Sequence, residues 1–380
     1  MKLDRELLQH EWHPETRYRP IGQALETLGK SCVFTHESDA TKPNTLRNKV
    51  SFLFRSLASL PGAALRALAS LDKSYFTLET PATKPQLSKP DELQVLTLNA
   101  ACLPSWITTT YNHLRSTEER AQEIADYIAT HQDNYDVICL QEVFSESAIS
   151  IIKDRLATTY GWSVHHAGRE YFGFNSGLCI FSKFPIVSAD FERYRRLVGE
   201  DAMTNKGYLS ADIQVGEKKV RVYTTHTQAG GYPKFLKKKW LLGNQAMRHS
   251  FQFESFARHI QKAEKSNQFA AVIVTGDFNL KVSDEKEKNA HGKCLFQLFT
   301  KHRPQNAKKI PGTTYTKEYL TSHNKEKAAK SEPFQTKGRI IDGCFVTKNS
   351  KIKKMTVKIV EEFTNSSDHL AIWAKITLRS

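Results

Sequence analysis

The chain has 380 residues, of which 39% are hydrophobic and 25% charged, and its formal net charge is +15. This composition is ordinary for a globular protein, and the length allows one large domain with an appendage or two domains. No run of about 18 uncharged apolar residues occurs, so we expect no ordinary transmembrane helix. The basic excess favours polyanionic partners, but by itself it does not choose among nucleic acid, an anionic membrane and a phosphorylated substrate.

The cysteines include no Cys-x-x-Cys pair, and Cys139, Cys179 and Cys344 fall inside strand-like runs. Buried thiols of this kind are typical of a reducing, cytosolic-type compartment. The chain starts with Met1-Lys-Leu-Asp-Arg-Glu, which lacks the apolar core of a secretory signal peptide. We therefore expect no ordinary signal peptide.

Residues 1–90 are predicted to form a helical N-terminal segment followed by a linker. Apolar residues recur at helical spacing between Val50 and Leu71, on both sides of Pro61-Gly62, which predicts an amphipathic hairpin. Such a hairpin either lies in a membrane interface, attracted by anionic lipid, or packs on the rest of the protein, and both interpretations stay open. The proline-containing stretch 81–90, rich in Lys and Ser, indicates the linker.

Residues 91–380 alternate between apolar strand-like runs and amphipathic helical patterns. Strands are expected at 93–99, 135–142, 176–182, 207–213, 220–226, 271–279, 339–346, 355–361 and 370–378, and helices at 116–130, 146–160 and 247–262. This mixture predicts a four-layer α/β sandwich, in which two packed mixed sheets are flanked by helices. A Lys-rich stretch, 281–308, interrupts the pattern, and its role is not apparent.

Polar residues stand at the ends of the apolar strands. In Ala271–Asn279 an apolar run meets Gly276, and Asp277 and Asn279 follow two residues apart, so their side chains point the same way. The other polar strand ends are Asn99, Glu142, His226, Asp342 and Asp368 with His369. Each has an ordinary structural explanation by itself, such as a turn former, a helix N-terminal charge or a satisfied buried imidazole. So many together indicate a shared site.

Three motifs carry a family resemblance: Leu-Gln-Glu142-Val, Gly-Asp277-Phe-Asn279 and Ser-Asp368-His369-Leu. They resemble the signature of the endonuclease/exonuclease/phosphatase superfamily. Within it the chain is most similar to neutral sphingomyelinases, especially the animal membrane-associated branch, over roughly residues 93–378. The matching segments are Asn99–Pro104, Phe174–Leu178, Phe181–Pro185, Gly199–Gly207, Thr225–Ala229 and Gly338–Asp342. The 50–75 hairpin resembles the family's juxtamembrane apolar segment.

The resemblance implies Mg²⁺-dependent hydrolysis of sphingomyelin to ceramide and phosphocholine, with Mn²⁺ as an alternative ion. It implies Glu142 as the magnesium ligand, with Asn99 beside it and Asp368 completing the acid cluster. An oxygen-only shell suits Mg²⁺. Lys206, in Asn-Lys-Gly, matches a family lysine near the site.

The resemblance also implies how the water and the phosphate are handled. Asp277 would orient or activate the water, and Asn279 would hydrogen-bond the phosphate. His369 would be the general base, with Asp342 orienting its ring. His226 would either stabilise the phosphate or protonate the leaving group.

Other substrates within the superfamily are less favoured. Inositol polyphosphate 5-phosphatases usually carry Cys-Asp-Arg near the position of Asp342, where this chain has Ile-Asp-Gly-Cys. Nucleases share two of the motifs and would suit the +15 charge, but they do not usually carry His-x-Gln-Ala, present here as His226-Thr-Gln-Ala229. Nucleic acid therefore stays open as an alternative substrate. A catalytically inactive lipid-binding adaptor is disfavoured because every acid and histidine of the site is present.

The phosphocholine headgroup is cationic, so it does not explain why the protein carries a basic net charge. We expect the basic charge to hold the enzyme on an anionic lipid surface, as a peripheral membrane protein close to its sphingomyelin substrate. The sequence names no protein partner.

Overall fold

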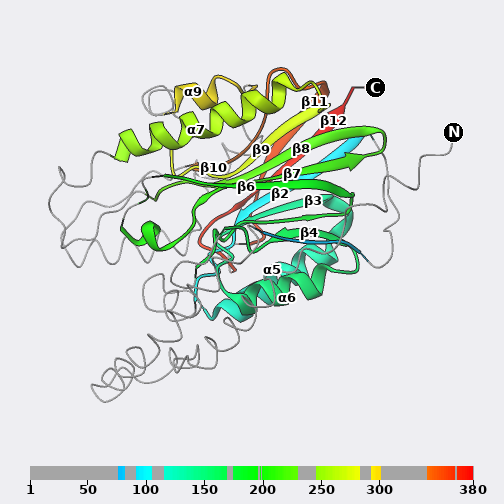
Figure 1. Cartoon of the computed structure of the whole chain (residues 1–380). Helices are drawn as coiled ribbons and strands as arrows, with labels where there is room; N and C mark the ends of the chain where they lie inside the picture. The colour runs from blue at the N-terminus through cyan, green and yellow to red at the C-terminus, as the bar shows by residue number, and fades with distance from the viewer. Residues whose placement is uncertain are drawn as a thin grey trace, which may run out of the picture.

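The computed structural model describes residues 76–81, 91–104, 115–168, 174–195, 197, 199–229, 245–282, 292–300, 340–363 and 366–379. The predicted hairpin, most of the linker and most of the Lys-rich stretch 281–308 lie outside these residues. Within them, two β-sheets lie face to face, with α5 (Thr117–Thr130) and α6 (Glu146–Leu156) on one outer side and α7 (Gln245–Lys265) and α9 (Lys293–Phe296) on the other (Figure 1). The predicted four-layer α/β sandwich is confirmed.

The first sheet has seven strands in the order β1-β4-β5-β3-β2-β12-β11. Their bounds are Thr77–Glu79, Trp162–His165, Cys179–Ser182, Val137–Gln141, Glu92–Asn99, Ala371–Leu378 and Ile352–Val360, in that order. Only the β2–β3 pairing is parallel among these strands, so the sheet is mixed. Strand β1 lies within the 1–90 segment and pairs with β4, so the sheet already begins in that segment.

The second sheet has five strands in the order β10-β9-β8-β7-β6. Their bounds are Asp342–Val346, Ala271–Asp277, Lys218–His226, Gly207–Val215 and Ile186–Arg193. Here β8 and β9 are parallel and the other pairs are antiparallel. Because β2, β3, β8 and β9 all run towards the same edge of the sandwich, the polar residues at their ends can meet there (Figure 1).

The burial of strand β9 on both faces explains why its sequence begins with an unbroken apolar run. Ile273 packs in the core between the two sheets, whereas Val272 and Val274 point the other way and pack against α7. A third core lies between α5, α6 and the outer face of the seven-stranded sheet. A strand covered on both faces needs apolar residues at every position, and each such side chain contributes about 1.5–3 kcal/mol on full burial.

The helices begin where the sequence indicates. The Ser116 side chain accepts a hydrogen bond from the backbone N–H of Glu119, which caps α5, and two acids lie in the first turn. The short 3-10 helices η4 (Gln132–Asn134) and η5 (Gly199–Met203) are also present. No helix in the described part of the chain combines the length and apolar character needed to cross a bilayer.

Every strand and helix expected between residues 91 and 380 exists, with boundaries that differ by a few residues, whereas the helical hairpin expected between Val50 and Leu71 lies outside the described residues. The sequence patterns missed β1, β4 and β6. Strand β1 has only three residues, and β6 is an edge strand whose side chains alternate irregularly between buried and exposed. Cys139, Cys179 and Cys344 are buried free thiols in strands, as expected.

Candidate active site

The site lies where the strands of both sheets end. In the five-stranded sheet Asp277, the last residue of β9, is flanked by His226 on β8 and by Asp342 on β10. Gly276 lets β8 and β9 come this close, because it has a φ of 132° and a Cβ there would lie 2.0 Å from the carbonyl oxygen of Thr225. The glycine before Asp277 is therefore required by the backbone.

Asn99, at the end of β2, connects the two sheets. Its Nδ2 donates to Glu142 Oε1 at 2.9 Å and to Asp277 Oδ2 at 3.1 Å, and its Oδ1 accepts from the backbone N–H of Ala101. The Asn99 side chain is 1% exposed. One buried amide thus holds a carboxylate from each sheet in a fixed position.

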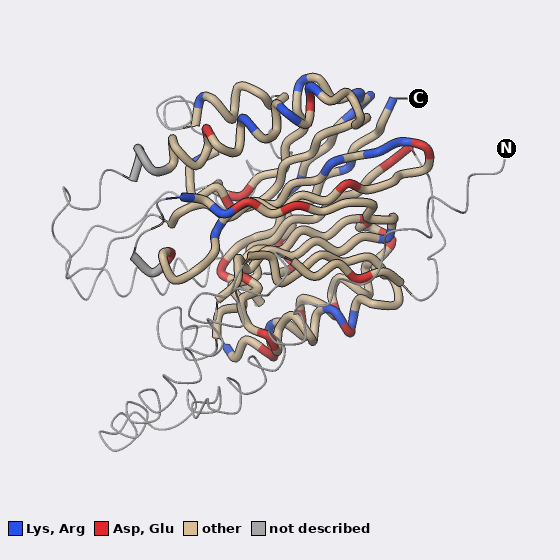
Figure 2. Tube along the Cα trace, in the orientation of Figure 1, with Lys and Arg blue, Asp and Glu red and all other residues tan. Residues whose placement is uncertain are grey.

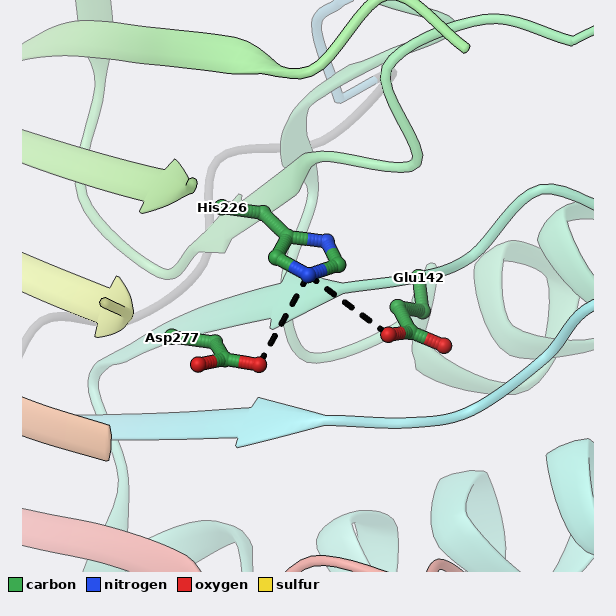
Figure 3. Close-up of side chains that lie close together, drawn as sticks. All are labelled: Glu142, His226 and Asp277. Carbon is green, nitrogen blue, oxygen red and sulfur yellow. Dashed lines mark ion pairs between the residues drawn. The ribbon is translucent and has the colours of Figure 1, made fainter. Parts of the chain in front are cut away.

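His226 faces the same two carboxylates. Its Nε2 lies 3.6 Å from Glu142 Oε1 and 3.6 Å from Asp277 Oδ2 (Figure 3). Lys206 Nζ donates to the same Nε2 at 2.8 Å. Burial, together with the nearby charges of Lys206 and His369, holds the pKa of His226 well below its usual range. The ring is therefore neutral, with Nε2 as the acceptor.

Asp277 and Glu142 have raised pKa values. Burial, reinforced by the Asp342 carboxylate, raises the pKa of Asp277 to about 7. Burial also raises the pKa of Glu142, and the charge of Asp368 adds to this effect. Carboxylates crowded into a buried position compete for protons in this way unless a cation neutralises them.

His369 and Asp342 form a buried pair. His369 Nδ1 lies 2.8 Å from Asp342 Oδ2. Burial alone would lower the pKa of His369, but the Asp342 carboxylate and its hydrogen bond, with Asp368 and Asp277 nearby, raise it well above its usual range. The backbone N–H of His369 donates to Ser367 Oγ at 3.0 Å, and this hydroxyl donates to the Asn99 carbonyl oxygen at 2.6 Å. Ser367 therefore links Asn99, which holds Glu142 and Asp277, to His369, which pairs with Asp342.

Left-handed backbone occurs at several residues of the site. Ala101, Glu142 and Asn279 have φ values of 49°, 58° and 45°. Such a conformation is strained for a residue with a side chain and is typical of functional sites. In Asn279 it lets the backbone N–H bond to Asp277 Oδ1 at 2.8 Å, while Nδ2 donates to the Thr227 carbonyl oxygen at 3.0 Å.

Asp201 supports Lys206 and the segment after His226. Its Oδ1 lies 2.8 Å from Lys206 Nζ, and its Oδ2 accepts from Gln228 Nε2 and from the backbone N–H of Ala229, both at 2.6 Å. The sequence motifs singled out Lys206 and His226–Ala229 but not Asp201. A carboxylate five residues before the lysine, in the same matching segment Gly199–Gly207, is the signal that could have identified it.

The structure brings all the predicted residues to this one end of the sandwich. They are Asn99, Glu142, Lys206, His226, Asp277, Asn279, Asp342, Asp368 and His369. Their individual roles stay predictions. Asp201 and Ser367 lie within the matching segments Gly199–Gly207 and Ser-Asp368-His369-Leu, but the sequence reasoning gave them no role, since their positions carry no periodicity.

The donor set fits a divalent cation. Two groups of side chains have their ligand atoms within 4.8 Å of one another: Glu142, His226 and Asp277, and Asp277, Asp342 and His369. In the described part of the chain, Asp342 Oδ1 and Asp368 Oδ1 are buried and make no hydrogen bond. Oxygen donors dominate, as Mg²⁺ requires. The residues present therefore suit Mg²⁺.

Comparison with known proteins agrees with this geometry. Residues 96–369 match the Endonuclease/Exonuclease/phosphatase family, and the chain belongs to that family. Among curated relatives, a putative neutral sphingomyelinase of Caenorhabditis elegans is 25% identical over 76% of this chain and 67% of its own length. A sphingomyelinase of Dictyostelium discoideum is 25% identical over 69% of this chain and 61% of its own length. The chain is thus a family hydrolase similar to sphingomyelinases.

Solved structures share the fold. A beta toxin mutant from Staphylococcus aureus with bound magnesium ions has a TM-score of 0.57 and 19% identity, covering 74% of this chain and 99% of its own. TDP2 from D. rerio, complexed with single strand DNA product, has a TM-score of 0.52 and 19% identity, covering 75% of this chain and 99% of its own. The beta toxin mutant thus holds magnesium ions, and the same fold occurs in a protein solved with a DNA product.

Proposed function

We propose that this protein is a Mg²⁺-dependent phosphodiesterase that hydrolyses sphingomyelin to ceramide and phosphocholine. One observation carries the proposal. Asn99 holds Glu142 and Asp277 together on one side of the site, and the Asp342–His369 pair lies on the other side, within reach of Asp277. Hydrolysis of a phosphodiester requires one group of residues that binds a cation and, in contact with it, another that accepts a proton.

His369 is the proposed general base. With Nδ1 held by Asp342, Nε2 is the atom proposed to take a proton from the attacking water. A cation bound beside Asp277 and Asp368 would offset the negative charges that raise the pKa of His369, so that the ring could accept this proton. Asp342 fixes the ring orientation and stabilises the imidazolium that forms. Asp277, bonded to the backbone of Asn279, orients the water between His369 and the phosphorus atom.

Glu142, Asn99 and Asp368 are the residues proposed to hold Mg²⁺. The bound ion would neutralise the phosphate oxygens as charge develops on them. Three observations support this assignment: Glu142 belongs to one of the two groups of converging ligand atoms, its pKa is raised by burial and by the charge of Asp368, and Asn99 is hydrogen-bonded to it. Mn²⁺ takes a similar oxygen shell and is expected to substitute.

Lys206 and Asn279 are proposed to contact the phosphate, and His226 to support Lys206. A neutral His226 whose Nε2 accepts from Lys206 has no proton at that atom to give to the leaving group. Of the two roles expected for His226, stabilising the phosphate therefore fits better, with the ring holding Lys206 Nζ in position. Asn279 Nδ2 is held by the Thr227 carbonyl oxygen and keeps a second hydrogen to offer.

Sphingomyelin is proposed as the substrate because two of the curated relatives are a putative neutral sphingomyelinase and a sphingomyelinase. The His226-Thr-Gln-Ala229 motif supports the same choice. We further propose that the protein resembles the animal membrane-associated branch in acting at a membrane surface, where its basic charge attracts anionic lipid. Salt-insensitive binding to anionic vesicles, unchanged by deletion of residues 1–75, which spares strand β1, would contradict this part.

A side-by-side assay tests the substrate. The purified protein is given sphingomyelin micelles, plasmid DNA, RNA and phosphoinositides, each with Mg²⁺ or with chelator. The proposal predicts Mg²⁺-dependent cleavage of sphingomyelin. Nicked plasmid with intact sphingomyelin would overturn the substrate assignment while leaving the phosphodiesterase chemistry in place.

A nuclease is the second candidate. It is favoured by the net charge of +15 and by the fold shared with TDP2, which is solved with a DNA product. In the described part of the chain, Lys and Arg residues occur on α7, at the β7–β8 hairpin and on the helices α5 and α6 (Figure 2). Against a nuclease stands the His226-Thr-Gln-Ala229 motif, which nucleases of the superfamily do not usually carry.

A further inference from the structure

A buried arginine of α5 lies behind the site and has no counterpart in the expected chemistry. Arg120 is 0% exposed, and its guanidinium donates to three backbone carbonyl oxygens. These are Ala100 at 3.2 Å, Ala101 at 2.9 Å and Ser366 at 3.0 Å. Its Nε donates to the Arg115 carbonyl oxygen at 3.1 Å, so the guanidinium is held on several sides.

The carbonyl groups that it binds belong to the two loops that carry the site. Ala100 and Ala101 directly follow Asn99, and Ala101 has the left-handed φ of 49°. Ser366 precedes Asp368 and His369 by two and three residues. The rigid fork of an arginine can bond several carbonyl groups at once, whereas a lysine ammonium acts as a compact point charge.

General stability does not account for a charge at this position. In the described part of the chain no carboxylate is within ion-pair distance of the Arg120 guanidinium, and a buried charge without a partner is costly. The residue also lies near the N-terminus of α5, where the helix dipole disfavours a cation. The hydrogen bonds to the carbonyl groups of the two loops therefore explain why an arginine is buried at this position.

The neighbouring residues reinforce the same connection. Ser367 Oγ joins the Asn99 carbonyl oxygen to the backbone of His369, and Ser366 Oγ donates to Glu123 Oε2, one turn after Arg120 on α5. We propose that Arg120 is a positioning residue, which sets the distance between the metal-side residue Asn99 and the base His369 by binding both loops. This inference rests on the proposed phosphodiester chemistry.

The test compares Arg120→Ala and Arg120→Lys with the matched control Arg221→Ala. Arg221 lies on β8, five residues before His226, and pairs with Asp212, so its loss destabilises the fold away from the site. All proteins are assayed well below their unfolding temperatures. We expect kcat on sphingomyelin micelles to fall about 10- to 100-fold in Arg120→Ala with KM changed less than about twofold, because a shift of about 1 Å in catalytic groups costs this much.

A readout without substrate separates this inference from the proposed function. Calorimetric titration with Mg²⁺ alone should show about tenfold weaker binding in Arg120→Ala, since Asn99 loses its support. Millimolar guanidinium chloride should restore part of both losses by filling the vacated space. Arg221→Ala should show neither loss. If the wild type cleaves no sphingomyelin but Arg120→Ala still weakens Mg²⁺ binding, the substrate is wrong and the positioning role stands.

The contrary results are equally specific. Wild-type kcat and Mg²⁺ affinity in folded Arg120→Ala would overturn the proposal, even if that variant unfolds at a lower temperature. A loss that guanidinium leaves unchanged and that Arg221→Ala reproduces would also overturn it. If Arg120→Ala does not fold, Arg120→Lys decides, because it keeps the charge but loses the fork, and undiminished kcat in it would overturn the proposal.

Discussion

His369 Nδ1 and Asp342 Oδ2 lie 2.8 Å apart in a buried part of the site. The two residues come from opposite sheets, since Asp342 begins β10 and His369 lies in the loop before β12. The contact orients the imidazole ring, since the proton on Nδ1 points at the Asp342 carboxylate. It also makes the strength of the base depend on Asp342. The two residues therefore have to be tested as a unit.

Replacing Asp342 with Asn should lower kcat by at least about 100-fold while the fold stays intact. The amide keeps the shape of the side chain but removes the negative charge that raises the pKa of His369. Steady-state kinetics with a circular dichroism spectrum check this. His369→Ala should lose a similar factor, and the double variant should be little worse than either single one. Additive losses would show that the residues act separately.

Replacing Glu142 with Gln should remove most turnover without unfolding the chain. The loss of charge weakens the cation-binding half of the site, whereas the hydrogen bond from Asn99 can still be accepted. We expect kcat to fall at least about 100-fold and the apparent Mg²⁺ requirement to rise. Glu119→Gln, an exposed change of the same kind on α5, is the matched control. An unchanged rate in Glu142→Gln would refute the metal-side assignment.

Mg²⁺ binding should depend on pH near neutrality. Without the ion, burial and the Asp342 carboxylate raise the pKa of Asp277 to about 7, so a proton competes with the cation below that pH. The dissociation constant should rise by up to about tenfold per pH unit as the pH falls below about 7, and level off above it. Calorimetry in buffers of different ionisation enthalpy measures the proton released. In Asp277→Asn the affinity for Mg²⁺ should be weaker and should not change with pH over the same range. A wild-type affinity that does not change with pH would contradict this cause.

Gly276→Ala should destabilise the protein by about 1–3 kcal/mol and lower activity. Its Cβ would lie 2.0 Å from the Thr225 carbonyl oxygen, so β8 and β9 would have to separate where His226 and Asp277 face each other. Urea unfolding measures the change. Gly216→Asn, in the β7–β8 hairpin with a φ of 60°, is the control, because asparagine tolerates that conformation. Equal effects in both would remove the special role of Gly276.

The sequence was informative where a physical period was present. The apolar run of β9 and the two polar residues after it predicted both the strand and its place in the site, because a strand covered on both faces has no polar positions until it ends. Strand β6 was missed because it lies at an edge, where side chains need not alternate cleanly. Strand β1 has too few residues to show a period.

Residues that act through other residues were harder to predict. Arg120 stands in an amphipathic helix, where the pattern assigns a charged residue to solvent, yet it is fully buried against loop carbonyl groups that only the fold brings near. Asp201 likewise lies in the short 3-10 helix η5 and meets Lys206 and Gln228 through tertiary contacts. A single sequence carries no local signal for such contacts.

The central claim is that this site cleaves the phosphodiester of sphingomyelin. The most direct measurement is the release of phosphocholine and ceramide from sphingomyelin micelles, quantified together for the wild type and for Glu142→Gln. We predict equal amounts of the two products from the wild type with Mg²⁺, almost none with chelator, and almost none from Glu142→Gln. Intact sphingomyelin in the presence of Mg²⁺, or equal product from Glu142→Gln, would contradict it.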